Sequence, residues 1–63
     1  MYCAIDGRRV TVRETSGRLV RQFSMNANVI GAQVNGEEVI IQCEGGWTHV
    51  YRTSGGFIRK TKN

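Results

Sequence analysis

Residues 29–43 read VIGAQVNGEEVIIQC, and this stretch decides the fold. Asn35-Gly36 is the strongest hairpin signal in the chain, because a tight two-residue turn needs backbone angles that Asn and Gly adopt easily. A two-residue loop there pairs Ala32 with Val39. One face of the hairpin then carries Ile30, Ala32, Val34, Val39, Ile41 and Cys43. The other face carries Gln33, Glu38 and Gln42, with Val29 and Ile40 as apolar exceptions. This alternation predicts two antiparallel strands with one buried face.

The segments on either side of this hairpin resemble each other. A shift of 38 residues places residues 2–23 over residues 40–61, and six of the 22 pairs are identical, against about one or two expected from ordinary composition. The identical pairs are Gly7/Gly45, Val12/Val50, Thr15/Thr53, Ser16/Ser54, Gly17/Gly55 and Arg21/Arg59. Most of them fall at predicted turns. We therefore expect a single small β domain, residues 1–63, with repeat halves at residues 2–23 and 24–61.

The predicted strands follow one another in an antiparallel meander of about seven short strands. Besides the central hairpin they include Arg9–Arg13, Arg18–Phe23, Trp47–Arg52 and Gly56–Thr61. No window has helical periodicity; residues 24–28 are expected to form a loop or a single helical turn, and residues 60–63 to fray. The sequence thus predicts an all-β fold with a blade-like internal duplication, and a small SH3-like or OB-like barrel is the alternative.

Residues 29–61 resemble one blade of a WD-repeat-type β-propeller. The resemblance is carried by Asn35-Gly36, Glu44-Gly45-Gly46, the aromatic strand Trp47–Arg52, Thr53-Ser54-Gly55 and Phe57-Ile58. Residues 2–23 resemble the last three strands of a second blade, so the chain would hold about one and three-quarter blades. The Trp-Asp and Gly-His pairs of that family are absent, and no functional residue is carried across. Since a propeller closes with about four to eight blades, the resemblance implies that several chains complete a ring or sheet, or that the units form a small barrel or sandwich.

Length and composition limit the size of the core and the range of partners. A chain of 63 residues buries only about 60% of the surface that it exposes when unfolded, and a lone sheet leaves its apolar face wet and its edges unpaired. We therefore expect a homo-oligomer. No apolar run reaches the roughly 20 residues of a spanning helix, and no leader is recognisable. With Cys3 and Cys43 interpreted as buried free thiols, we expect a cytoplasmic protein without a membrane partner.

Aromatic residues form the first candidate site. Trp47, His49 and Tyr51 alternate and so share one face of a predicted strand, with Phe57 on the next strand. We expect this row to be core or a subunit interface, because large aromatic side chains dominate both and the opposite face of the strand is more polar. The alternative is a stacking platform for bases or sugars, with Arg52 and Arg59 supplying phosphate contacts.

Positive charge forms the second candidate site. The chain has nine Lys and Arg against five Asp and Glu, a formal charge of +4, and none of the nine lies between Gln22 and Tyr51. If the two ends meet in the fold, one basic surface results. Its predicted members are Arg8, Arg9, Arg13, Arg18, Arg21, Arg52, Arg59 and Lys60. Such a surface attracts phosphate through counterion release, and it equally keeps a small protein soluble.

Motifs for catalysis are absent from the sequence. His49 is the only imidazole, and no triad spacing or nucleophile elbow accompanies it. Cys3, Cys43 and His49 lack the spacing of a zinc site, and neither Gly-Gly pair opens a predicted helix. We therefore expect no catalytic residue, no metal and no cofactor. The sequence favours a non-catalytic protein-interaction or self-assembly module, with a small basic nucleic-acid-binding β protein as the alternative.

Overall fold

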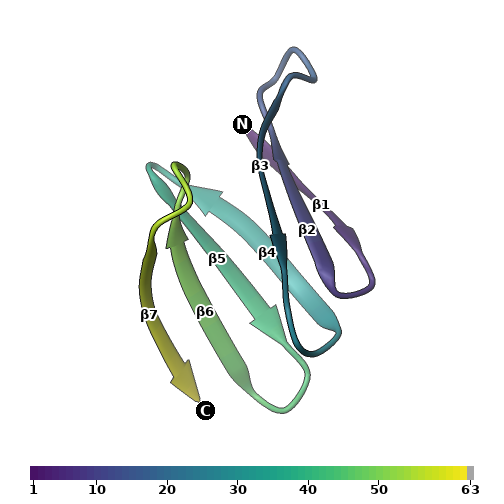
Figure 1. Ribbon diagram of the computed structural model, residues 1–63, viewed down its shortest axis with the longest axis vertical. Coiled ribbons are helices and arrows are strands. Elements are labelled where there is room, and N and C mark those ends of the chain that lie inside the picture. The colour runs from purple at the N-terminus through teal and green to yellow at the C-terminus, as the bar shows by residue number, and fades with distance from the viewer. Residues whose placement is uncertain (63) are drawn as a thin grey trace.

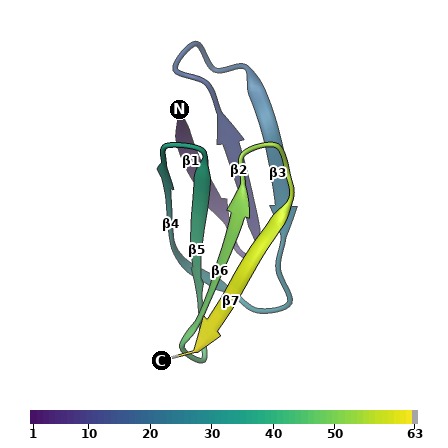
Figure 2. The same ribbon diagram turned by 90° about the vertical axis from the view of Figure 1, so that its left-hand side faces the viewer.

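The computed structural model describes residues 1–62, which form seven strands and no helix. In chain order the strands are β1 (Tyr2–Asp6), β2 (Arg9–Arg13), β3 (Leu19–Ser24), β4 (Val29–Asn35), β5 (Glu38–Cys43), β6 (Trp47–Arg52) and β7 (Phe57–Lys62). β1–β3 form a three-stranded antiparallel sheet and β4–β7 a four-stranded one, and the two sheets lie as separate layers (Figure 1, Figure 2). The predicted all-β meander is confirmed. The barrel alternative is wrong for the described residues, because their strands form two sheets that do not close on each other.

The core lies between the two sheets and is built from alternate residues of the strands, together with Met25 of the connection that follows β3. Its buried members are Val10, Val12, Phe23, Met25, Val29, Val39, Ile41 and Cys43. β2 and β5 supply most of them, because successive side chains of a strand point to opposite faces and only one face of each sheet meets the other sheet. Val10 and Ile41 are wholly buried. The core is therefore mostly aliphatic, and Phe23 is its one buried aromatic side chain among the described residues.

From Ala32 onward the β4–β5 hairpin has the predicted faces but a different register. Its turn is Gly36-Glu37, so Ala32 pairs with Ile41 instead of Val39. Gly36 adopts a φ of +64°, and glycine is the residue that two-residue hairpin turns of type II′ use at this first position. The predicted register was wrong by two residues. A shift of two leaves every side chain on its own face, which is why the predicted faces of Ala32 and Ile41 remain correct.

A β-bulge on β4 changes which apolar residues are buried. The register shifts between Val29 and Gly31, so that Ile30 is the extra residue of the bulge. Val29 is buried in the core, whereas Ile30 is 66% exposed. The prediction had placed Ile30 on the buried face and Val29 on the other. It was wrong because an unbroken alternation was assumed through the bulge.

Ser24 ends β3, and the connection between the sheets, residues 25–28, is irregular and contains no helical turn. The Met25 amide donates to the carbonyl of Arg8 at 2.7 Å, and the Val29 amide donates to the carbonyl of Gly7 at 2.9 Å. These bonds hold the connection against the β1–β2 turn. At the other end of the chain β7 continues to Lys62, so the prediction of fraying is wrong for residues 60–62, and Asn63 lies outside the described residues.

The internal repeat is present in the backbone of the two Thr-Ser-Gly corners. In the first corner the Glu14 amide donates to the carbonyl of Arg18, and the Gly17 amide donates to the carbonyl of Glu14, both at 2.8 Å. The same two bonds recur 38 residues later, at 2.7 and 2.8 Å, among Arg52, Gly55 and Gly56. The strand register also shifts at equivalent places, after Val12 and after Val50. The two corners and their flanking strands are therefore duplicates.

The first strands of the two units align with a one-residue difference. β1 and β2 are joined by a two-residue turn, Gly7-Arg8, whereas residues 44–46 join β5 to β6. Because of this extra residue, β1 is equivalent to β5 at a shift of 37. The pairing of Cys3 with Val12 recurs as the pairing of Ile40 with Val50. The repeated unit is thus β1–β3 and β5–β7, and β4 has no counterpart among the described strands.

The two units are stacked front to back. We call the front of a unit the face that carries Val10 and Val12 in the three-stranded sheet, and Thr48 and Val50 in the four-stranded sheet. The back carries Arg9, Thr11 and Arg13 in the three-stranded sheet and, at the equivalent positions, Trp47, His49 and Tyr51 in the four-stranded sheet. Val10 and Val12 belong to the core whereas Val50 lies outside it, and Tyr51 packs against the core. The front of one unit therefore covers the back of the other, unlike a two-fold sandwich, in which equivalent faces meet.

Candidate functional site

The aromatic row Trp47, His49 and Tyr51 lies on the inner face of β6, which is the back of the four-stranded sheet. The residues of β5 that pair with this row all belong to the core: Cys43, Ile41 and Val39. The three aromatic side chains themselves are half-buried. The Tyr51 ring lies 4.6 Å from the Phe23 ring and meets the Phe57 ring edge-on at 5.4 Å. Tyr51 is therefore part of the packing between the sheets, while Phe57 remains 58% exposed.

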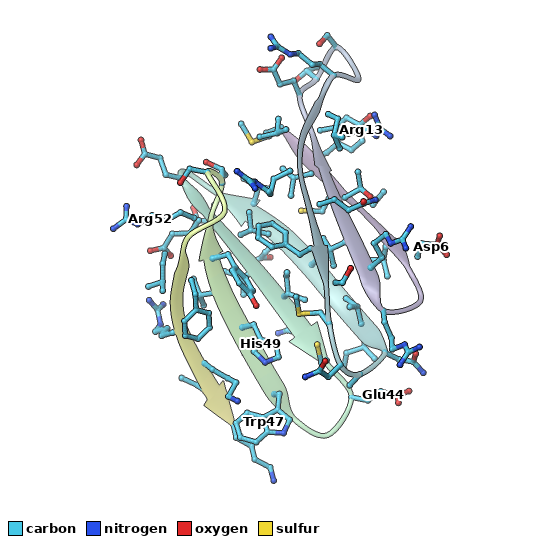
Figure 3. The ribbon with its side chains drawn as sticks, viewed as in Figure 1. Asp6, Arg13, Glu44, Trp47, His49 and Arg52 are labelled. Carbon is cyan, nitrogen blue, oxygen red and sulfur yellow. The ribbon has the colours of Figure 1, made fainter. Side chains whose placement is uncertain are left out.

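An open cavity of about 350 Å³ lies between this row and the connection that follows β3. Its walls include Trp47, His49, Tyr51, Asn26, Met25 and Lys60. In Figure 3, His49 lies midway along the four-stranded sheet and Trp47 at its lower end. The cavity therefore has an aromatic wall on β6, a wall from the connection, and one cation. No carboxylate is among its described lining residues.

Two ammonium groups lie at the Trp47 ring. The Nζ atom of Lys60 is 4.8 Å from the ring centroid and that of Lys62 is 5.3 Å from it, both within the range of a cation–π contact. Across β6 and β7, Lys62 pairs with Trp47 and Lys60 pairs with His49, so the register brings both lysines to the inner face. Lys62 was not among the predicted site residues, although alternation along β7 places it on the same face as Lys60.

The arginines expected beside the aromatic row lie elsewhere. Arg59 pairs with Val50, and Arg52 pairs with Glu38, on the outer face of the four-stranded sheet. They are therefore separated from Trp47 by the thickness of the sheet. The cations that accompany the aromatic wall are lysines of β7, and Arg52 and Arg59 do not contribute to this cavity.

Cys43 and His49 form the polar pair of the cavity wall. The Cys43 Sγ atom lies 3.7 Å from Nδ1 of His49. Burial raises the pKa of the Cys43 thiol, while burial and then the charge of Lys60 lower the pKa of His49, so both groups are neutral at pH 7. A nucleophilic cysteine needs a lowered thiol pKa, and this pair has the opposite electrostatics. Within residues 1–62 no three His, Cys, Asp or Glu side chains are grouped to hold a metal ion.

The predicted basic surface is divided among different faces. Arg9 and Arg13 lie on the back of the three-stranded sheet, opposite in the molecule to Arg52 and Arg59; Figure 3 shows Arg13 and Arg52 on opposite sides. Of the other members, Arg8 and Arg18 lie in the connections between strands. Arg21 and Lys60 point inward, toward Ser54 and into the cavity respectively. The two ends of the chain therefore do not combine their charges on one surface.

Arg21 links the two sheets. Its Nη2 donates to the carbonyl of Ser54 at 2.6 Å. The guanidinium lies over Gly55, where an added Cβ would be 2.7 Å from Cζ of Arg21. Gly17, at the equivalent corner, has no atom within 4 Å of such a Cβ. The repeat had matched Arg21 with Arg59, but only Arg21 points inward, because only the front of the three-stranded sheet faces the other sheet.

A second hollow, of about 480 Å³, lies at the β1–β2 turn, and Asp6, Arg8 and Arg9 are among its lining residues. Among residues 1–62 there is no helix with the length and apolar character needed to span a membrane. Comparison with protein-family models, with curated proteins and with solved structures finds no match for this chain.

Proposed function

We propose that the protein is a non-catalytic self-assembly module whose copies stack front to back. The observation that supports this most strongly is the stacking of β1–β3 on β5–β7 within one chain. It leaves the back of the three-stranded sheet and the front of the four-stranded sheet on the outside. A second copy can place the first of these surfaces on the second in the geometry that the chain itself already uses.

The two outer faces have side chains that suit a contact between proteins. The front of the four-stranded sheet carries Ile40, which is half-buried, beside Val50, of which only 3% is exposed. On the back of the three-stranded sheet, Thr11 pairs with Ala4 between the flanking arginines. Both faces thus have small or aliphatic residues near the middle and polar ones around them, the distribution that protein interfaces have.

A front-to-back contact joins two different surfaces, so it is heterologous. Such contacts produce a closed ring when the rotation between copies divides a full turn, and an open filament when it does not. The resemblance of residues 29–61 to a propeller blade supports the ring, because propeller blades stack around a central axis. The expected assembly is therefore a ring of several chains.

The solution mass and a pair of complementary variants test this proposal. Light scattering after size exclusion should give a mass that is a multiple of 7.1 kDa. Ile40→Lys removes the front contact and Thr11→Lys the back contact, so each variant alone should be a monomer. Mixed in equal amounts, they retain one intact front and one intact back and should form a dimer. Ser16→Lys, at an exposed corner, is the control and should leave the wild-type mass unchanged.

Two results would contradict the proposal. A wild-type mass of 7.1 kDa at millimolar chain concentration would remove self-assembly altogether. If one of the two variants still forms a dimer by itself, the contact joins equivalent faces, and if both variants are monomers and their mixture is also monomeric, the two surfaces do not bind each other; either result shows that the front-to-back geometry is wrong.

Nucleic-acid binding through one broad basic surface has less support. A surface that follows a phosphate backbone needs its cations along one groove or face. Arg9 and Arg13 lie on one outer face, and Arg52 and Arg59 lie on the other. The charge that the sequence places at both ends of the chain is thus divided by the two-layer fold.

A further inference from the structure

We propose that the cavity beside β6 binds a nucleoside phosphate unit, with the planar base against Trp47 and the phosphate on Lys60 and Lys62. This inference does not rest on self-assembly, because the cavity lies between the sheets of one chain. It rests on the size of the cavity, on its aromatic wall, and on the sign of its charge.

The size and shape of the cavity suit a single planar ring system. Its volume of about 350 Å³ is near the lower end of the roughly 300–1,000 Å³ of small-molecule sites. The ring of Tyr51 already packs against that of Phe23, with the two rings tilted by 37°. Trp47 is half-buried and meets only the two lysine ammonium groups among the ring and cation contacts of residues 1–62, so its indole is the surface available to a ligand. Any nucleobase can stack on such a ring, since every base has a π face.

The charge around the cavity selects an anion. An aromatic ring binds a ligand cation over a ring face that no other cation occupies. The centroid of the Trp47 ring already has the Nζ atoms of Lys60 and Lys62 at 4.8 and 5.3 Å, and these would repel a further cation. No Asp or Glu is among the described lining residues to balance a second cation. A phosphate makes charge-assisted hydrogen bonds with ammonium groups, and these are stronger than an exposed cation–π contact. The lysines can therefore turn from the indole to a phosphate and leave the ring to the base.

Polar groups on the opposite wall can contact the edge of a base. Asn26 lines the cavity from the connection, and its amide carries both a donor and an acceptor, the combination that matches a base edge. His49 lines the cavity from β6, where it pairs with Lys60 of β7. Because its pKa is lowered by burial and by Lys60, its ring offers a neutral hydrogen-bonding group. The phosphate is thus left to the two lysines.

A nucleoside phosphate unit of this kind occurs both in a free mononucleotide and in single-stranded RNA or DNA. Calorimetric titrations with AMP, adenosine, inorganic phosphate and a six-residue oligoadenylate separate these sources. AMP should bind at least about tenfold more tightly than adenosine or phosphate alone, because each of these lacks one of the two contacts. An oligoadenylate that binds much more tightly than AMP identifies single-stranded nucleic acid as the source, and equal affinities identify the free nucleotide.

Matched variants locate the binding. Trp47→Leu keeps an apolar side chain but removes stacking, and should weaken AMP binding at least about fivefold, whereas Trp47→Phe should keep most of it. Lys60→Gln should also weaken it about fivefold and reduce its salt dependence. Arg59→Gln is the control, since it removes the same charge from the neighbouring position on the opposite face of β7. Circular dichroism confirms that each variant is folded.

The proposal is overturned if neither AMP nor the oligoadenylate binds at millimolar concentration and low salt. It is also overturned if Trp47→Leu binds AMP as the wild type does. Equal losses in Lys60→Gln and Arg59→Gln would show that net charge, and not this cavity, attracts the ligand. The mass measurements that test self-assembly are unaffected by these outcomes, so the two proposals fail separately.

Discussion

Gly55→Ala, compared with Gly17→Ala, measures how much the Arg21 contact contributes to holding the two sheets together. The two glycines occupy the same place in duplicate corners, with φ angles of +109° and +95°. An alanine at either place has an unfavourable backbone conformation. Only at Gly55 does the new Cβ also meet a neighbour, at 2.7 Å from Cζ and 2.8 Å from Nε of Arg21. The comparison therefore separates backbone strain from the loss of the Arg21 contact.

The expected magnitudes follow from these two contributions. An L residue forced to positive φ costs about 1–2 kcal/mol in the free energy of unfolding, and this is the whole cost at Gly17. At Gly55 the guanidinium must also leave the carbonyl of Ser54. A hydrogen bond to a charged group contributes about 1.5–3 kcal/mol when buried, and we take about 1 kcal/mol because this one is exposed. Gly55→Ala should therefore cost about 2–3 kcal/mol, and melt about 4–8 °C below Gly17→Ala.

Urea and thermal unfolding followed by circular dichroism provide the measurement. The control is the same pair of glycine substitutions in an Arg21→Ala background, where Gly55→Ala should cost no more than Gly17→Ala does. If the two glycine substitutions have equal cost in the wild-type background, Arg21 contributes nothing to the joining of the sheets. An excess cost at Gly55 that persists without Arg21 would equally refute the reasoning.

The core and the cavity wall give further predictions. Ile41→Ala, at a wholly buried position, should lower the free energy of unfolding by about 2–5 kcal/mol. Ile30→Ala, at the exposed bulge, should change it by less than about 0.5 kcal/mol. If urea unfolding shows similar losses for the two variants, the assignment of Val29 to the core in place of Ile30 is contradicted. The pKa of His49 is lower in the folded protein than in the unfolded chain, where it is about 6.5. Below that pH the imidazole of the unfolded chain binds more protons than that of the folded protein. The free energy of unfolding is therefore fully retained above about pH 6.5 and falls as the pH drops below it. His49→Gln should therefore flatten the decline of melting temperature between pH 7 and pH 5, and an unchanged slope would show that His49 titrates alike in both states.

Turn chemistry explains how much of the fold could be predicted. The strands Arg9–Arg13 and Trp47–Arg52 have the bounds that the sequence predicts, because glycine-bearing turns limit each of them on both sides. The errors come from single residues that interrupt the alternation, such as the bulge at Ile30 and the third residue of the turn 44–46. One added residue reverses the face of everything that follows it, and hydrophobic periodicity does not show where such a residue is accommodated.

The candidate site was predictable only in part, because it too depends on single residues that interrupt the alternation of faces along a strand. The alternation of Trp47, His49 and Tyr51 was sufficient to place them on one inward face. The face taken by Lys60 depends on the register shift between Val50 and Tyr51, which the sequence does not specify. The cavity itself depends on the path of residues 25–28, and backbone hydrogen bonds to the distant carbonyls of Gly7 and Arg8 determine that path.

The meander order of the strands has a consequence for the kinetics of folding. Because each strand pairs only with its neighbour in sequence, either sheet forms by closing short loops, and the entropy lost in each closure is small. Low contact order of this kind is associated with fast folding. The step that joins distant parts of the chain is the docking of one finished sheet on the other, which brings Phe23 to Tyr51 and Arg21 to Ser54. We therefore expect two local nuclei, and a barrier at which the sheets meet.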